Sequence, residues 1–245
     1  MHSALLYILA VLFLATVIRS TFGFGEALIA VPLLALRIPL QVAAPLAVLV
    51  SITIAMVVVA QDWRHIHLPS VGGLLGSTIL GIPVGLLLLK LGQPQIVKAA
   101  LALLLICFSI YCLRGRPLLT LKSDSKGWLF ACGFSAGVLG GAYGMNGPPL
   151  ILYGAMRRWS AQQFRATLQG YFLPASILGI TSYWVGGLWT RTVTHDYLWS
   201  LPAVLPAIWI GRAFNRRLHG ERFLRYVYLG LATVGCVLLA QSLHR

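Results

Sequence analysis

The sequence predicts an all-α polytopic membrane protein, and its composition, charge pattern and long apolar runs support this prediction. Of the 245 residues, 58% are hydrophobic and 10% are charged, whereas a soluble domain has about 25% charged residues. The mean hydropathy is +0.84. The net charge of +14 comes from short basic clusters between long uncharged runs, which is typical of membrane helices and their loops. The composition excludes a soluble or a disordered protein, and we expect contact with a lipid bilayer and no nucleic-acid partner.

Eight charge-free runs are the candidates for membrane helices, which need about 20 apolar residues each. They lie at 1–18, 38–61, 65–89, 99–113, 127–156, 166–190, 197–211 and 226–244. We expect the first run to be a retained membrane segment and not a signal peptide. No Lys or Arg precedes its apolar part, and apolar sequence continues beyond it.

Glycine and proline interrupt three of these runs. The first run continues through Arg19 into the Gly-rich stretch 22–26, and a second apolar piece then ends at Leu36. The run 127–156 is interrupted at 140–149, which contains Gly, Asn and Pro. The run 65–89 contains five glycines and Pro83, which indicates a tightly packed or kinked helix.

Two of the interruptions occupy matching places in an internal repeat. Residues 23–33 align loosely with 140–150, and residues 84–98 resemble 210–225. We therefore divide the chain into two membrane repeats, 1–118 and 119–245, each predicted to hold a broken, re-entrant helical hairpin and three transmembrane helices. Matched breaks in two halves indicate the binding site of a transporter; the alternative is a chance enrichment of Gly and Pro, which membrane helices show in any case.

The basic residues distinguish two possible topologies. If each run crosses the membrane once, they divide 11 to 7 between the two sides. If each interrupted segment folds back without a net crossing, they divide 13 to 5, with Arg19 uncounted. The positive-inside rule favours the second division, which makes the halves inverted repeats, places loop 114–126 in the cytoplasm and leaves both termini outside. This parity does not separate re-entrant hairpins from pairs of full crossings, but residues 147–156, about 15 Å long as a helix, are too short to span.

Glu26 is the acid that stands inside a hydrophobic segment, whereas the other four lie in predicted loops or at helix ends. A carboxylate at membrane depth is costly and usually faces a cavity or a partner. One interpretation is a proton-coupling or gating carboxylate. The other is structural: Glu26 caps a helix over 27–36 or pairs with the nearby Arg19.

The glycine-rich breaks predict a site for a small anion. Glycine lets a ligand approach the backbone closely, and a helix that begins at depth directs free N–H groups and its positive dipole end into the cavity. The candidate substrate-binding residues at the breaks are Gly23, Gly25, Gly144, Asn146 and Gly147. Gln169 and Arg165 open the next helix and join this set; Arg165 either attracts anions to an inner vestibule or anchors the helix at the interface.

The chain lacks the motifs of the common enzyme classes. It has no phosphate-binding G-x-x-x-x-G-K-[ST] motif, no H-E-x-x-H and no G-x-S-x-G. The four cysteines lie in apolar stretches without metal-ligand spacing and are expected to be buried thiols. The pairs His65 and His67, and His195 and Asp196, are weak metal signals and are expected in interfacial loops. We therefore expect no enzymatic activity, no cofactor and no metal.

Two motifs resemble those of a known transporter family. Residues 23–34, GFGEALIAVPLL, are similar to the first signature of the sulfite exporter TauE/SafE family, and residues 137–150, GVLGGAYGMNGPPL, followed by FRATL at 164–168, are similar to the second. The resemblance covers nearly the whole chain in length, duplication and order of segments. It implies a secondary transporter for sulfite, sulfonates, sulfoacetate or related organic anions. Many members of the family have glycine where Glu26 stands.

These observations combine into one functional hypothesis. The protein is expected to be a multi-pass transporter of the cell (inner) membrane that moves a small sulfur-containing or organic anion by alternating access. Protons are the expected coupling ion, with Glu26 as the coupling residue, and the chain could form a homo-oligomer. The alternative is a passive anion channel that uses the same helix starts.

Overall fold

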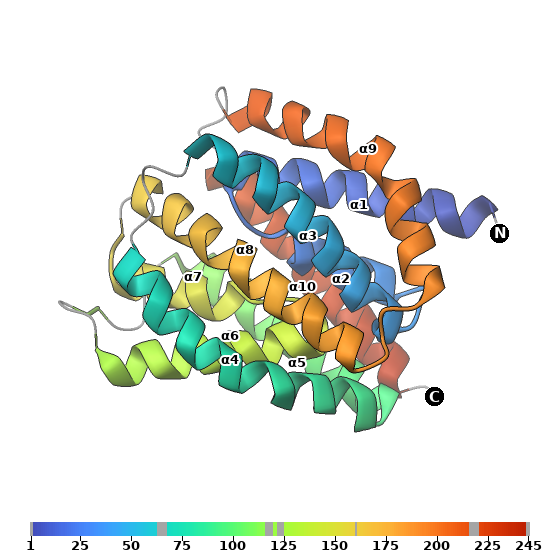
Figure 1. Ribbon diagram of the computed structural model, residues 1–245, viewed down its shortest axis with the longest axis horizontal. Coiled ribbons are helices and arrows are strands. Elements are labelled where there is room, and N and C mark those ends of the chain that lie inside the picture. The colour runs from blue at the N-terminus through green and yellow to red at the C-terminus, as the bar shows by residue number, and fades with distance from the viewer. Residues whose placement is uncertain are drawn as a thin grey trace.

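A computed structural model describes residues 2–62, 68–115, 120–121, 125–159, 161–215 and 221–243. These residues form a bundle of ten helices without strands (Figure 1). The helices are α1 (His2–Phe22), α2 (Glu26–Ala35), α3 (Leu40–Asp62), α4 (Leu68–Leu91), α5 (Pro94–Arg114), α6 (Lys126–Tyr143), α7 (Gly147–Met156), α8 (Ala161–Val185), α9 (Arg191–Asn215) and α10 (Glu221–Leu243). The expected all-helical class is confirmed.

Four helices in the described ranges are long and apolar enough to cross a membrane by length and composition. The candidate spans are Leu5–Phe22, Leu40–Val57, Val71–Leu91 and Pro94–Arg114. The runs expected at 166–190 and 197–211 fall in α8 and α9, which have 25 residues each but are less apolar. The Gly-rich run at 65–89 forms the continuous helix α4, with Pro83 inside it.

The helices follow the order long, short, long, long, long twice along the chain. The short members, α2 and α7, have ten residues each, which is about 15 Å and half of what a bilayer crossing needs. Each follows a sharp turn in the backbone: Gly23 and Gly25 precede α2 with φ of 86° and 97°, and Gly144 precedes α7 with φ of 66°. Glycine adopts these left-handed conformations without a steric cost, so both expected breaks lie where the glycines stand.

Contacts between connections establish which of them share an end of the bundle. The amide of Leu121, between α5 and α6, donates to the carbonyl of Met156 at the end of α7, 2.8 Å away. Lys98 near the start of α5 donates to Gln241 near the end of α10. Figure 1 shows α1 beginning, α10 ending and the α4–α5 connection at one end of the bundle. The segment before α6 and the segment after α7 thus lie together at one end of the bundle.

The first helix of each half, which ends at the break, packs on a long helix of the other half. The helix α6 packs along α4, and α1 packs along α9 (Figure 1). Glycines make the first contact close: a Cβ atom on Gly85 of α4 would meet the carbonyl oxygen of Val138, and one on Gly137 of α6 would meet that of Thr78. In the second contact, a Cβ on Gly211 of α9 would lie 2.6 Å from Val17 O. Such close approach of backbones is characteristic of membrane helices.

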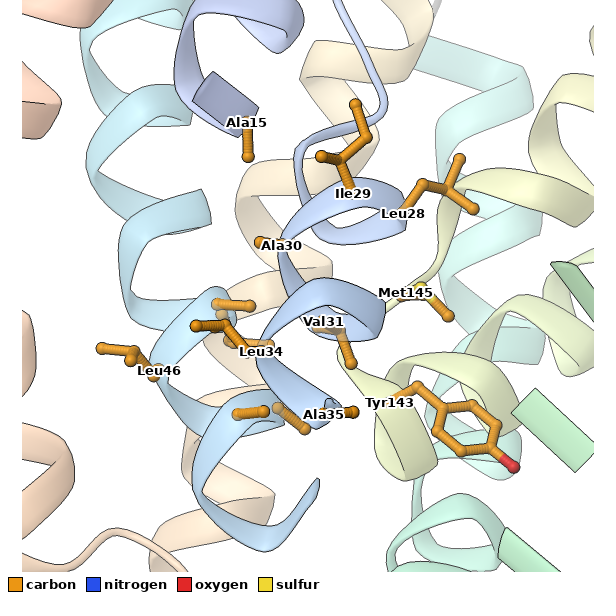
Figure 2. Close-up of a cluster of buried hydrophobic side chains, with 14 of the residues drawn as sticks. Ala15, Leu28, Ile29, Ala30, Val31, Leu34, Ala35, Leu46, Tyr143 and Met145 are labelled. Carbon is orange, nitrogen blue, oxygen red and sulfur yellow. The ribbon is translucent and has the colours of Figure 1, made fainter. Parts of the chain in front are cut away.

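The hydrophobic core surrounds the short helix α2. Eight of its ten residues are buried, including Leu28, Val31 and Leu34. Figure 2 shows side chains around α2 that come from α1, from α3, from Tyr143 at the end of α6 and from Met145 in the break that follows. A helix that is apolar on all sides is stable only when it is buried on all sides, and this packing fixes the depth at which α2 begins.

Two expectations about individual residues need correction. Cys132 is buried, but Cys107 and Cys236 are exposed on the surface of the bundle and Cys112 is half-buried. The apolar stretches that hold Cys107 and Cys236 turn one face outward, so an apolar context did not imply burial. His195 and Asp196 lie in α9, just after its first turn, and not in a loop. His65 and His67 lie outside the described residues.

Candidate functional site

The two breaks meet at a small cavity between the halves of the chain. Its volume is about 20 Å³, room for about one water molecule. The first half contributes Arg19 from α1, Gly25 and Glu26 at the start of α2, and Ser51 from α3. The second half contributes the break at 144–147 and, from α8, Phe172 and Ser176.

A buried ion pair forms one wall of this cavity. Arg19 Nη1 lies 2.7 Å from Glu26 Oε2, and the two residues are 3% and 1% exposed. Arg19 Nη1 also donates to the hydroxyl of Ser51, which lies within hydrogen-bonding reach of the Glu26 carboxylate. The Arg19 guanidinium stands over the ring of Phe172, 5.1 Å from its centroid, a cation–π arrangement.

The ion pair leaves several of its polar atoms unused. Arg19 Nε and Nη2 and Glu26 Oε1 are buried without a hydrogen-bond partner in the described part of the chain. Buried polar atoms usually have a partner, and an unpartnered donor is costly. The guanidinium can therefore donate two further hydrogen bonds to a ligand that enters the cavity.

The two helix starts differ in what they offer to an anion. At α2 the first backbone N–H groups, from Gly25 to Leu28, lie before the intrahelical hydrogen bonds begin. At α7 the second and third helical residues are Pro148 and Pro149, which carry no N–H. The sequence interpretation treated the two starts as equivalent, but α2 presents the richer set of donors, and Glu26 and Arg19 stand beside it.

The structure brings most of the predicted site residues together. Gly25, Gly144, Asn146 and Gly147 line the cavity. Gly23 lies behind it, because its carbonyl accepts a hydrogen bond of 2.6 Å from Gln169 Nε2. Gln169 thus joins α8 to the first break from a position outside the cavity wall, with its Oε1 buried and unpartnered among the described residues. The side chain of Arg165 lies outside the described residues.

Asn146 is partly engaged by its neighbours. Its side chain packs over Gly140, where a Cβ atom would lie 2.6 Å from Asn146 Oδ1. The same side chain is within hydrogen-bonding reach of the Tyr171 hydroxyl, which pairs with Thr78 Oγ1 at 2.6 Å. Asn146 therefore shapes the second break through Tyr171 as well as facing the cavity.

The cavity residues from α3 and α8 were not predicted. Ser51, Phe172 and Ser176 stand inside long apolar runs, where single Ser or Phe residues are common and carry no signal. Ser176 Oγ lies 3.4 Å from Ser51 Oγ, so the two hydroxyls connect α3 and α8 across the halves. The pairing of Arg19 with Glu26 was one of the two interpretations of the acid and is confirmed; a side-chain cap on α2 is not found, since Gly25 is the N-cap.

A larger cavity of about 450 Å³ lies at the end of the bundle where α1 begins. Its walls come from the connection between α2 and α3 and from the adjoining ends of α4 and α5, and they include Arg37 and Lys98. The Arg37 guanidinium stands 4.5 Å from the centroid of the Tyr7 ring. The two basic residues make this cavity a positively charged vestibule at the C-terminal end of α2.

Nothing in the described ranges forms a metal site, because no three His, Cys, Asp or Glu residues cluster there. His195 Nδ1 lies 3.1 Å from Asp196 Oδ1, on an exposed turn of α9.

The profile of the sulfite exporter TauE/SafE family matches residues 8–239 of the chain, nearly its whole length. The chain belongs to the sulfite exporter TauE/SafE family. Membership in TauE/SafE makes it a multi-pass membrane protein of a transporter family, with an anion as the expected cargo. No curated protein and no solved structure matches the chain at a significant level.

Proposed function

We propose that the protein is a secondary active transporter that couples the movement of a small sulfur-containing or organic anion to the movement of protons. The observation that supports this most strongly is the buried Arg19–Glu26 pair beside the helix start of α2, at a small cavity between two helix breaks. A charged pair is costly at membrane depth and is usually found there for function. Gly25, Gly144 and Gly147 let the anion approach the backbone.

The small volume of the cavity favours alternating access over a passive pore. Room for about one water molecule is too little for a sulfur oxyanion, so the halves have to move apart to admit one. The walls of the cavity come from both halves, and rocking of one half against the other opens it to one side at a time. The vestibule at Arg37 and Lys98 lies at the end of the bundle to which one of these openings leads.

Glu26 is the proposed coupling residue. A proton on Glu26 and an anion in the cavity neutralise each other, so each lowers the cost of desolvating the other. The positive-inside rule places loop 114–126 in the cytoplasm and both termini outside. The positively charged vestibule then faces outward, and the protein resides in the cell (inner) membrane.

A flux assay in proteoliposomes tests the coupling. Radiolabelled sulfite is supplied under an imposed pH gradient, and we expect the wild type to accumulate it above equilibrium. Glu26→Gln should abolish accumulation driven by the gradient. Asp196→Asn, which removes an acid of α9 that pairs with His195 and does not line the cavity, should accumulate sulfite like the wild type.

Two results would contradict the proposal. If Glu26→Gln accumulates sulfite as the wild type does, Glu26 is not the coupling residue. If the wild type only equilibrates sulfite across the membrane, the protein is a passive anion channel.

A further inference from the structure

We propose that Arg19 holds the transported anion, which displaces the Glu26 carboxylate as that carboxylate takes up a proton. This inference deepens the proposed function and rests on it. It assigns the substrate class, compact oxyanions with a single negative charge, and the stoichiometry, one proton with each anion.

Arg19 has hydrogen-bond donors that it does not use within the protein. Its Nε and Nη2 lie on one edge of the guanidinium and are buried without a partner in the described ranges, whereas Nη1 serves Glu26 and Ser51. Two parallel N–H groups bind two oxygens of a sulfonate, a hydrogen sulfite or a carboxylate at once. The N–H groups that begin α2 border the same cavity, and they add to the attraction of an anion.

The charges that line the cavity balance each other. Arg19 from α1 and Glu26 from α2 are its charged members. The groups facing them are Ser51 from α3, Phe172 and Ser176 from α8 and Asn146 from the second break, with the Tyr171 hydroxyl behind Asn146. The described walls therefore carry no net charge before an anion enters.

This balance determines what can bind. An entering monoanion leaves one uncompensated negative charge, which is expensive in a buried site. Protonation of Glu26 removes it: the proton binds to the carboxylate, the Arg19–Glu26 pair separates, and Arg19 pairs with the anion instead. A dianion would leave a negative charge even after Glu26 is protonated, so the site selects monovalent oxyanions.

The charged pair of Arg19 and Glu26 occurs in the first half of the chain only. The short helices begin 121 residues apart, at Glu26 and at Gly147, so the helices correspond four residues later than in the loose sequence alignment of 23–33 with 140–150. The residue that stands 121 positions after Arg19 is Gly140, so glycine takes both corresponding places in the second half. One pair in the cavity provides for one anion and one proton in each transport cycle.

Binding of methanesulfonate, whose charge stays at −1 across the working pH range, tests the assignment on the purified full chain. We expect titration calorimetry in buffers of different ionisation enthalpy to show uptake of one proton with each anion. We expect the affinity to rise about tenfold for each unit by which the pH falls.

Two variants isolate Arg19 from Glu26. Glu26→Gln should still bind methanesulfonate but with no proton uptake and no dependence on pH. The double variant Arg19→Gln/Glu26→Gln carries neither charge, leaves no unpaired ion in the core, and should not bind. The proposal is overturned if the double variant binds methanesulfonate, or if the wild type binds it without taking up a proton. The second outcome is measured on the wild type alone, so it does not depend on whether a variant folds.

Transport distinguishes this inference from the proposed function. A pH difference of one unit should drive an accumulation of methanesulfonate that reaches a limit of about tenfold. This limit should be the same when the membrane potential is clamped at zero and when it is clamped at a large value of either sign. Accumulation that follows the potential overturns the one-to-one stoichiometry. If the wild type accumulates sulfite but neither binds nor transports methanesulfonate, the assignment to monoanions is wrong while the proposed function stands. If nothing is accumulated but proton-linked binding persists in the wild type and is lost in the double variant, the proposed function fails and the role of Arg19 stands.

Discussion

At the scale of single residues, the Arg19–Glu26 pair is the feature that packing alone does not explain. Two side chains of similar size without charge would fill the same space, and buried ion pairs often stabilise a protein no more than apolar substitutes do. The unpartnered atoms Arg19 Nε, Arg19 Nη2 and Glu26 Oε1 add to the cost of the pair. A protein that keeps such an arrangement in its core uses it for something other than stability.

This reasoning predicts how the pair contributes to stability. Arg19→Met leaves Glu26 buried without its partner and should lower the free energy of unfolding by about 3–5 kcal/mol. The double variant Arg19→Met/Glu26→Leu removes both charges. Its free energy of unfolding should lie within about 1 kcal/mol of that of the wild type, or above it. Unfolding in mixed micelles, followed by circular dichroism, measures both. If the double variant is as unstable as the single one, the pair has a structural role and our interpretation of its cost is wrong.

The sequence predicted part of this arrangement for a clear physical reason. An acid in an apolar segment is rare, and Gly-rich breaks are visible in any membrane helix, so Glu26 and the glycines at both breaks could be identified. The partners could not. Ser51 and Ser176 are single hydroxyls in apolar helices, and only the packing of α1, α3 and α8 brings them to one cavity with Arg19.

At the scale of helices, lengths and breaks were predictable but packing partners were not. The glycines of the run 65–89 indicated tight packing, and the structure shows that the tightly packed partner is α6, from the other half of the chain. Sequence periodicity identifies the small face of a helix without naming the helix that it meets. The close contact also explains why α4 continues through Pro83 as one helix: its glycine face is held along the length of α6.

The glycines of α4 therefore differ in their tolerance of a side chain. A Cβ on Gly85 would meet the Val138 backbone oxygen, which cannot rotate away, so Gly85→Ala should destabilise the protein by about 1–3 kcal/mol. Gly76 of the same helix has open space around its Cβ position. Gly76→Ala should have no cost and can stabilise the helix by up to about 1 kcal/mol. Thermal unfolding of the purified variants makes the comparison, and equal losses at both positions would refute the proposed role of the α4–α6 contact.

At the scale of the whole molecule, the two halves depend on each other. The broken helix of each half packs on the fourth helix of the other, and the cavity takes walls from both. The division at residues 118 and 119 into inverted repeats remains a prediction, supported by the repeated order of helix lengths. Neither half encloses the cavity alone, so movement of one against the other is the motion that opens it.

The topology gives the last prediction, because the fold-back arrangement and the single-crossing arrangement place the same residues on different sides. The connections contain three exposed positions, Thr120, Arg158 and Gln93. The hydrogen bond from Leu121 to Met156 places Thr120 and Arg158 at one end of the bundle. Figure 1 places the α4–α5 connection, which contains Gln93, at the other end. In a background with the four native cysteines replaced, single cysteines at Thr120 and Arg158 should react with a membrane-impermeant maleimide from the same side, and one at Gln93 from the opposite side. The positive-inside rule predicts that the side with the basic residues near Thr120 and Arg158 is the cytoplasm. Both positions should then be protected in intact cells and labelled in inverted vesicles. Labelling of Thr120→Cys and Arg158→Cys from opposite sides would mean that the second break does not fold back, and the helix starts of α2 and α7 would then not face one cavity.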